Sequence, residues 1–311
     1  MTTPCADPEL SLIVCTKNPR HDYLAKTFAA LREQTLPLTA WQLVVVDNDS
    51  TPPLRTRIEL DWHPNARLVT ESEPGFTPAL LRGIQEVSGN VCVLVHDDNL
   101  LAPEYLEQVC RIAREWPQLG AWGGGYEPEY EEQPAPHLAP YLGYLAVNAC
   151  KHDHWSNRLY DYAATPCGAG MAVRTDVLRH YAGLLRHDAR RRSLGRHTDK
   201  LTSCEDFDIA FTAIDLDYGT GVFSCLRVTH LIPKARVQPD YLRRLVEGHA
   251  YSTVLLHSFR GDTASPPRGW LARIRRWRRL CRLSQTEREV QTALARGEER
   301  AFALLTQTSN E

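Results

Sequence analysis

The sequence lacks the marks of a membrane-spanning or a secreted chain. No apolar run approaches the roughly 20 residues that a helix needs to cross a bilayer. The first ten residues, MTTPCADPEL, contain no basic segment and no long apolar segment, so no secretory signal is recognised. These absences predict a cytoplasmic protein.

Cysteine usage and charge exclude further classes. The nine cysteines are odd in number, scattered, and form no C-x-x-C pair. This pattern disfavours a zinc site or a disulfide framework and favours a reducing compartment. The formal net charge of −2 argues against a nucleic-acid-binding protein. No G-x-G-x-x-G follows the first apolar run, which disfavours a dinucleotide-dependent oxidoreductase.

The first part of the chain alternates short apolar runs with helical periodicity. Strands are expected at 10–15, 43–46, 67–70 and 91–95, and helices at 22–34, 78–87 and 103–116. Continuous apolar strands between amphipathic helices are typical of a parallel sheet that is covered on both faces. The sequence therefore predicts an α/β fold with a Rossmann-like, mostly parallel central sheet.

The pattern changes after residue 122. The stretch from Gly123 to Thr165 is rich in Pro, Tyr, Glu and His, and we expect an insertion or an irregular loop region there. Regular structure is expected to return at 167–173 and to continue with helices at 176–185 and from Cys204, a strand at 222–228 that stops before His230, and a helix at 240–256.

The C-terminal part differs in charge. Between Thr263 and Thr286 there is no acidic residue but there are seven arginines. Trp270, Ile274 and Trp277 recur at helical spacing, so one face is apolar. Two interpretations stay open: residues 268–282 lie on an anionic membrane surface, or they form a helix that docks on the rest of the protein.

Acidic residues follow two of the expected strands. The segment 47–49 reads Asp-Asn-Asp, and the segment 96–99 reads His-Asp-Asp-Asn. Open α/β sheets bind ligands beyond the carboxyl ends of their strands, so these acids gather where a ligand is expected. Mg²⁺ and Mn²⁺ use one or two carboxylates together with phosphate oxygens. The plainer alternative is that the acids only cap a turn or a helix.

The order of six segments is more specific than any one of them. LSLIVCTKN, LVVVDNDS, HDDN, CGAGMAV, CEDFDIAF and VTH follow one another over roughly residues 10–250, and this order resembles the family 2 glycosyltransferases of the GT-A fold. The resemblance implies an inverting enzyme of the hexosyltransferase type. It would transfer a sugar from a nucleotide-diphosphate donor, expected to be UDP-linked, to a hydroxyl of a glycan or a lipid-linked acceptor, as in polysaccharide biosynthesis.

The resemblance also implies a domain layout and a set of site residues. A GT-A domain is expected over 1–260, with a nucleotide-binding half at 1–122, an acceptor and catalytic half at 123–260, and a helical extension at 261–311. The expected donor contacts are Thr16, Asn18, Asp47, Asp49, Asp97, Gly168, Ala169 and Gly170. Asp98 and His230 are expected to hold Mg²⁺ or Mn²⁺. Asp206 is the expected catalytic base, with Glu205 as its neighbour.

Two departures from the family pattern keep alternatives open. His96 stands where the first acid of the metal motif often lies, and Ala79 is followed by Leu80 and Leu81 where the family often has Arg and Asn. They motivate a catalytically degenerate, glycosyltransferase-like assembly subunit as one alternative. The other is a nucleotidyltransferase on a similar sheet, although that chemistry usually needs a glycine-rich basic loop after the first strand, and residues 16–20 contain no glycine.

Overall fold

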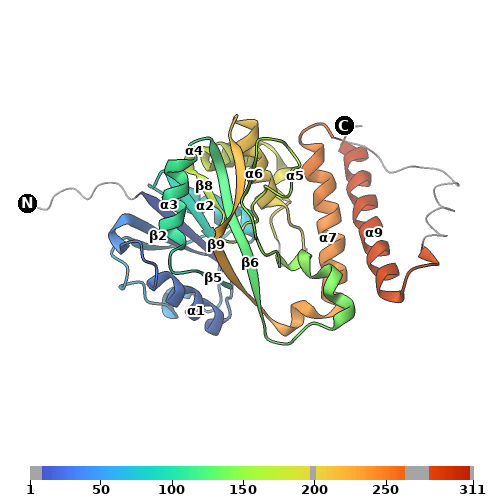
Figure 1. Ribbon diagram of the computed structural model, residues 1–311, viewed down its shortest axis with the longest axis horizontal. Helices are drawn as coiled ribbons and strands as arrows, with labels where there is room; N and C mark the ends of the chain where they lie inside the picture. The colour runs from blue at the N-terminus through green and yellow to red at the C-terminus, as the bar shows by residue number, and fades with distance from the viewer. Residues whose placement is uncertain (1–8, 197–200, 263–279, 309–311) are drawn as a thin grey trace, which may run out of the picture. The chain divides into compact units, whose positions relative to one another are not determined.

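A computed structural model describes residues 9–196, 201–262 and 280–308 (Figure 1). The chain divides into two compact units. The sheet unit comprises Met1–Glu129, Ala146–Ala189 and Glu205–Ile232, and the helical unit comprises Tyr130–Leu145, Arg190–Cys204 and Pro233–Glu311. Every site residue expected from the sequence belongs to the sheet unit.

A single sheet organises the sheet unit, with the strand order β3-β2-β1-β4-β8-β6-β9-β5 and with β7 paired to β9. Its parallel part consists of β1 (Leu10–Thr16), β2 (Trp41–Asp47), β3 (Ala66–Thr70) and β4 (Val91–Val95). These strands form where the apolar runs predict them. The register places Thr16 beside Asp47, so the carboxyl ends of β1 and β2 meet at one edge.

The rest of the sheet is built by antiparallel pairing. Its strands are β5 (Asn99–Leu101), β6 (Leu119–Tyr130), β7 (His154–Ser156), β8 (Ala172–Arg174) and β9 (Gly219–Ile232). β8 pairs with both β4 and β6, while β9 pairs with β5 and β7. The pairing of β5 with β9 brings Asn99 opposite His230.

Helices cover both faces of the sheet. The helices α1 (His21–Arg32) and α3 (Tyr105–Glu115) share a buried cluster with Leu12 and Val14 of β1. The helices α2 (Phe76–Glu86), α4 (Thr175–His187) and α6 (Glu205–Asp215) share another with Ile13. Successive side chains of a strand point to opposite faces, so these two clusters lie on opposite sides of the sheet. The expected α/β architecture is confirmed.

Three expectations about the middle of the chain are wrong in detail. β6 runs through Gly123–Gly125, where an irregular region was expected. A Cβ atom on Gly124 would overlap the carbonyl oxygen of Leu226, so glycine serves close strand approach here. β9 continues through His230 because it pairs there with β5. Only Ala172–Arg174 of the stretch expected to be regular from residue 167 is a strand; the segment before it is a loop in which Gly170 has φ 75°.

The helical unit contains two long helices, α7 (Pro239–Ser258) and α9 (Gln285–Thr308), which pack side by side (Figure 1). Val246 of α7 is buried with Val290 and Ala293 of α9, and Arg300 forms an ion pair with Glu247 at 2.9 Å. Residues Ala189–Arg192 form the short helix α5. The 3-10 helices of the sheet unit are η1 (Leu38–Ala40) and η2 (Leu54–Thr56). Those of the helical unit are η3 (Pro136–Leu145) and η4 (Lys234–Val237).

Two observations bear on membrane contact. Among the described residues, no helix combines the length and the apolar character needed to cross a bilayer. The basic, tryptophan-containing segment expected to be a helix at 268–282 lies mostly outside the described residues.

Candidate active site

The first part of the candidate site lies at the carboxyl ends of β1, β2 and β4. Thr16 is buried at the end of β1, and its hydroxyl group donates a hydrogen bond to Oδ2 of Asp97, which follows β4. Thr16 also lies next to Asp47 in the strand register. Three of the residues expected to contact the donor nucleotide are therefore neighbours in space, as the parallel topology requires.

Asp47 shapes the loop that follows β2. Its side chain is 3% exposed, Oδ1 accepts a hydrogen bond from the amide of Ser50 at 3.0 Å, and Oδ2 accepts one from the amide of Leu54 at 2.7 Å. Asn18 holds the same loop, because its amide donates to Oγ of Ser50 and its Oδ1 accepts from the amide of Thr51. Both carboxylate oxygens of Asp47 thus bind the protein's own backbone.

The neighbouring Asn48 was not singled out by the sequence, although it stands between two acids that were. Its Oδ1 accepts a hydrogen bond from the amide of Gly75 at 2.8 Å, and its Nδ2 donates to the carbonyl oxygens of Glu71 and Glu73. Asn48 therefore fastens the segment before α2 to the carboxyl end of β2. Asp49, next in the chain, is exposed and has φ 58°.

The second part of the site joins β5 to β9. Nε2 of His230 lies 3.6 Å from Oδ2 of Asp98, and each side chain is 10% exposed. The amide of Leu231 also donates to the carbonyl oxygen of Asp98. The two side chains expected to hold a metal ion are therefore adjacent.

This pair fits a divalent cation that takes most of its ligands from phosphate. Within the part of the chain that the structure describes, no group of three His, Cys, Asp or Glu side chains is arranged to hold a metal. A carboxylate and an imidazole suit Mg²⁺ or Mn²⁺ only when a bound ligand supplies further oxygens. Asn99 adds a polar group beside them: its side chain is buried, and neither Oδ1 nor Nδ2 has a hydrogen-bond partner among the described residues.

The third part of the site is the carboxylate of Asp206, the second residue of α6. The amide of Gly168 donates a hydrogen bond to Oδ2 of Asp206 at 2.9 Å, and the amide of Phe207 donates to Oδ1 at 2.8 Å. A Cβ atom built on Gly168 would lie 3.7 Å from Asp206 Oδ2 and 3.7 Å from Cε1 of His96. Asp206 and the segment that follows β4 therefore meet at Gly168.

Glu205 opens α6 immediately before Asp206 and is half-buried. The hydrogen bond from Gly168 goes to Asp206. We call residues 167–170, which precede β8, the glycine loop. Of the two acids expected at the catalytic position, Asp206 is thus the one that is held against this loop. Both carboxylates benefit from the helix N-terminus, which favours negative charge in its first turn.

Two buried tyrosines hold the glycine loop in place. The hydroxyl group of Tyr126 on β6 shares its one proton between the carbonyl oxygen of Ala169, at 2.6 Å, and that of Cys167, at 3.0 Å. The hydroxyl group of Tyr105 on α3 donates to the carbonyl oxygen of Gly170 at 2.8 Å. Burial raises the pKa of both phenols above the usual value, so both hydroxyl groups stay protonated and can donate these hydrogen bonds. No local sequence pattern predicts these contacts, because each joins residues far apart in the chain.

The nearby cysteines do not supply a nucleophile. Burial, together with the negative charge of Asp206, raises the pKa of Cys167 to about 12. Burial and Asp97 likewise raise the pKa of Cys15 far above its ordinary value. Since thiolates rather than thiols are nucleophilic, Cys167 and Cys15 are unreactive in this environment.

The sheet order, the acids at the strand ends and the carboxylate at the start of α6 define the GT-A architecture. A family model described as glycosyl transferase family 2 matches residues 11–182, more than half of the chain. The chain therefore belongs to glycosyl transferase family 2 and is a glycosyltransferase.

Solved structures support the same fold. The mannosyltransferase PcManGT from Pyrobaculum calidifontis, in complex with GDP-Man and Mn²⁺, is 20% identical, with 98% of this chain and 80% of that chain covered and a TM-score of 0.55. Residues 1–349 of S. aureus TarS, in complex with UDP-GlcNAc, are 15% identical, with 93% and 80% covered and a TM-score of 0.54. The chain spans 40% of a longer S. aureus TarS chain. Among curated proteins, none matches.

Proposed function

We propose that this chain is an inverting glycosyltransferase that uses a UDP-linked sugar and transfers it to a hydroxyl group of a glycan or a lipid-linked acceptor. The observation that carries the proposal is the meeting of Asp206 with the segment after β4 at Gly168. Transfer needs a base for the acceptor hydroxyl beside a place for the departing diphosphate; the proposal assigns the base to Asp206 and the diphosphate to the segment after β4. Nucleotide-sugar complexes of two proteins with the same fold support a sugar nucleotide as donor.

In this proposal the nucleoside lies along the ends of β1 and β2. Thr16 and Asp97 contact the ribose, and the loop held by Asp47 and Asn18 lines the base. Because Asp47 already accepts two backbone hydrogen bonds, its main contribution is the shape of that loop. Gly168, Ala169 and Gly170 line the sugar, and a side chain on Gly168 would narrow the space between Asp206 and His96.

Asp98 and His230 would hold Mg²⁺ or Mn²⁺ through Oδ2 and Nε2. Such an ion stabilises the negative charge on a leaving diphosphate as a Lewis acid. The protein's own contribution is to keep these two side chains adjacent and largely shielded from water, at 10% exposure each. The backbone bond from Leu231 to Asp98 fixes the segment that carries the carboxylate.

Asp206 acts as the general base. The acceptor oxygen attacks the anomeric carbon on the face opposite the diphosphate, the bond from that carbon to the phosphate oxygen breaks, and the acceptor proton passes to the carboxylate of Asp206. A single displacement of this kind inverts the anomeric configuration. The amides of Gly168 and Phe207 orient the carboxylate. A positioned base of this kind contributes about 10²–10⁴-fold to the rate.

A non-catalytic, glycosyltransferase-like subunit is the second candidate. One observation favours it: His96 stands where the family often has the first acid of the metal motif, and among the described residues no group of three His, Cys, Asp or Glu side chains is arranged to hold a metal. This candidate predicts no turnover of any sugar nucleotide.

A thermal-shift screen of UDP, GDP, ADP and their sugar conjugates, with Mn²⁺ or with EDTA, tests the proposal. A ligand that binds only the native state raises its melting temperature. We expect UDP compounds to raise it with Mn²⁺, and Asp98→Asn to lose that metal-dependent increment. Asp153→Asn is the matched control, because Asp153 is an exposed carboxylate that binds Ser224. A shift with GDP compounds alone would reassign the donor, and no shift with any nucleotide would favour the non-catalytic candidate.

A further inference from the structure

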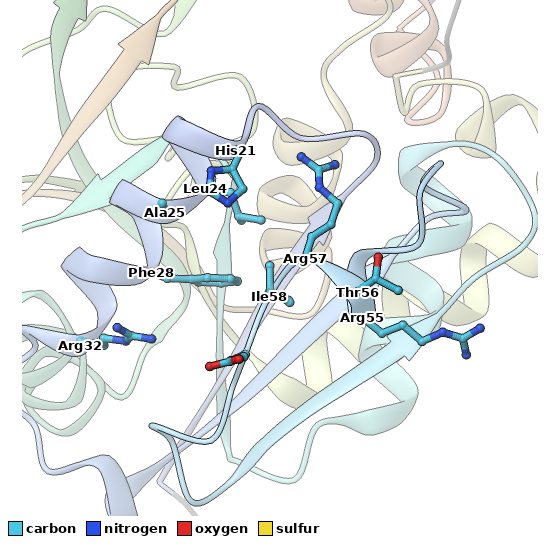
Figure 2. A pocket seen from close by; sticks show the side chains of 10 residues that line it. His21, Leu24, Ala25, Phe28, Arg32, Arg55, Thr56, Arg57 and Ile58 are labelled. Carbon is cyan, nitrogen blue, oxygen red and sulfur yellow. The ribbon is translucent and has the colours of Figure 1, made fainter.

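A cavity of about 440 Å³ lies in the sheet unit between α1 and the segment that follows η2. Figure 2 shows Phe28 of α1 and Ile58 of the other wall pointing toward one another across it. None of the residues that line it belongs to the donor, metal or base positions described above. Its volume falls in the range of small-molecule sites, which is roughly 300–1,000 Å³.

The backbone holds both walls of this cavity in place. The carbonyl oxygen of Leu54 accepts hydrogen bonds from the amides of Arg57 and Ile58 at 2.8 and 3.1 Å. The hydroxyl group of Thr56 donates to the carbonyl oxygen of Pro53 at 2.7 Å. The opposite wall is α1, whose Phe28 is buried in the core of the sheet unit. A ligand would therefore meet a preformed site and would not have to order a loop.

The polar lining of the cavity is predominantly cationic. His21, Arg32 and Arg57 line it together with Arg55, which extends away from α1 in Figure 2, and Glu59 is the one carboxylate in the lining. This concentration of guanidinium groups contrasts with the net charge of −2 of the whole chain.

Neither inward-facing guanidinium group is neutralised by a carboxylate. Arg32 lies over the ring of Trp62, with 5.0 Å from Cζ to the ring centroid, which positions its charge without an anion. Arg57 is half-buried, and the described part of the chain gives it no ion pair. A half-buried, unneutralised guanidinium is stabilised by an anionic ligand.

We propose that this cavity binds an organic phosphate monoester. Its phosphate is recognised by Arg57 and His21 at one end, and its apolar portion packs against the exposed edges of Phe28 and Ile58. Arginine suits phosphate because its planar fork donates two parallel hydrogen bonds. The carboxylate of Glu59 repels an anion, so the proposal places the phosphate with Arg57 and His21. A soluble metabolite and a lipid headgroup share this chemistry.

Calorimetric titration of the full chain with four probes tests the proposal. The probes are phenyl phosphate, dihexanoylphosphatidic acid, inorganic phosphate and benzyl alcohol. We expect the two organic phosphates to bind about tenfold or more tighter than inorganic phosphate and than benzyl alcohol, since both the charged and the apolar contacts are needed. Tighter binding of phosphatidic acid assigns the ligand to lipids, and tighter binding of phenyl phosphate assigns it to soluble metabolites.

Variants locate the binding. Arg57→Gln should raise the dissociation constants of both organic phosphates about tenfold. Ile58→Ser should also raise them, while the dissociation constant of inorganic phosphate stays unchanged. Arg111→Gln is the matched control, because Arg111 is exposed and paired with Glu115 on α3. The imidazole NMR signal of His21, assigned with His21→Gln, should shift on titration. The titrations are repeated with saturating UDP, which separates this cavity from the proposed donor site.

Several results would overturn the proposal. They are no binding of either organic phosphate at millimolar concentration, equal binding of inorganic phosphate, equal losses in Arg57→Gln and Arg111→Gln, and displacement of the probe by UDP. Failure of every nucleotide to bind would refute the proposed function but not this proposal, which the four probes test by themselves.

Discussion

Replacing Gly168 by alanine places a single methyl group at the point where the parts of the site meet. The added Cβ atom would lie 3.2 Å from Cβ of Asp206 and 3.7 Å from both Oδ2 of Asp206 and Cε1 of His96. The shortest of these contacts is tighter than an ordinary van der Waals contact, so Asp206 must move by a few tenths of an ångström. Gly168 has no positive φ that would strain an alanine.

The expected effect is larger on turnover than on stability. A misplacement of a reacting group by about 1 Å costs on the order of 10²-fold, so a smaller shift, with a methyl group in the acceptor's path, should lower turnover about 10- to 100-fold. Mild overpacking and the reduced freedom of the unfolded chain oppose one another, so we expect the free energy of unfolding to change by less than about 1 kcal/mol.

Turnover of the sugar nucleotide, nucleotide affinity and urea denaturation are measured on the same Gly168→Ala preparation. The control is Gly183→Ala in α4, because a Cβ there meets no atom within 4 Å. That control should stabilise the protein by about 0.5–1 kcal/mol and leave turnover unchanged. Wild-type turnover in Gly168→Ala, or an equal loss in both variants, would refute the convergence of Asp206 and His96 on one reaction space.

Three further substitutions test the supporting structure. Asp47→Asn should lower the free energy of unfolding by about 2 kcal/mol in urea denaturation. The side-chain NH₂ group of asparagine would then face one of the two backbone amides, of Ser50 or Leu54, that donate to Asp47. An unchanged free energy of unfolding would contradict the role of Asp47 in holding the loop. Burial lowers the pKa of His63 to about 4 from 6.5 in the unfolded chain, so stability is complete above pH 6.5 and is lost as the pH falls toward 4. The free energy of unfolding of the wild type should fall by about 2 kcal/mol between pH 7.5 and pH 5 in urea denaturation. The free energy of unfolding of His63→Asn should depend less on pH over the same range. Gly124→Ala should lower the free energy of unfolding by more than about 2 kcal/mol, because its methyl group would overlap the carbonyl oxygen of Leu226. A melting temperature equal to that of the wild type would show instead that β6 and β9 move apart easily.

The parallel half of the sheet could be predicted from the sequence because its signals are local. β1, β2 and β4 are continuous apolar runs, and α1, α2 and α3 carry apolar stripes at helical spacing. Once those strands are parallel, their carboxyl ends share an edge, so the gathering of Thr16, Asp47 and Asp97 follows from topology. The order of the family motifs then predicted the fold class and the enzyme class, and both are confirmed.

The antiparallel half could not be predicted to the same degree, because its order depends on distant partners. β6 contains three consecutive glycines, which locally favour a turn, and a Cβ atom on each would meet a distant segment: Pro166 for Gly123, Leu226 of β9 for Gly124 and Cys150 for Gly125. The position of His230 inside β9 depends on its pairing with Asn99, more than a hundred residues away. The glycine loop is likewise held by the hydroxyl groups of Tyr105 and Tyr126, which bind residues that are distant in the sequence.

The most direct test of the proposed chemistry compares two quantities in Asp206→Asn: the turnover of the sugar nucleotide and the dissociation constant of the nucleotide. Asparagine keeps the size of the side chain and one oxygen for the Gly168 amide, but it cannot take the acceptor proton. We expect turnover to fall about 10²–10⁴-fold while the dissociation constant changes by less than about threefold. Turnover at the wild-type rate, or a dissociation constant that rises as steeply as turnover falls, would contradict the assignment of Asp206 as the base.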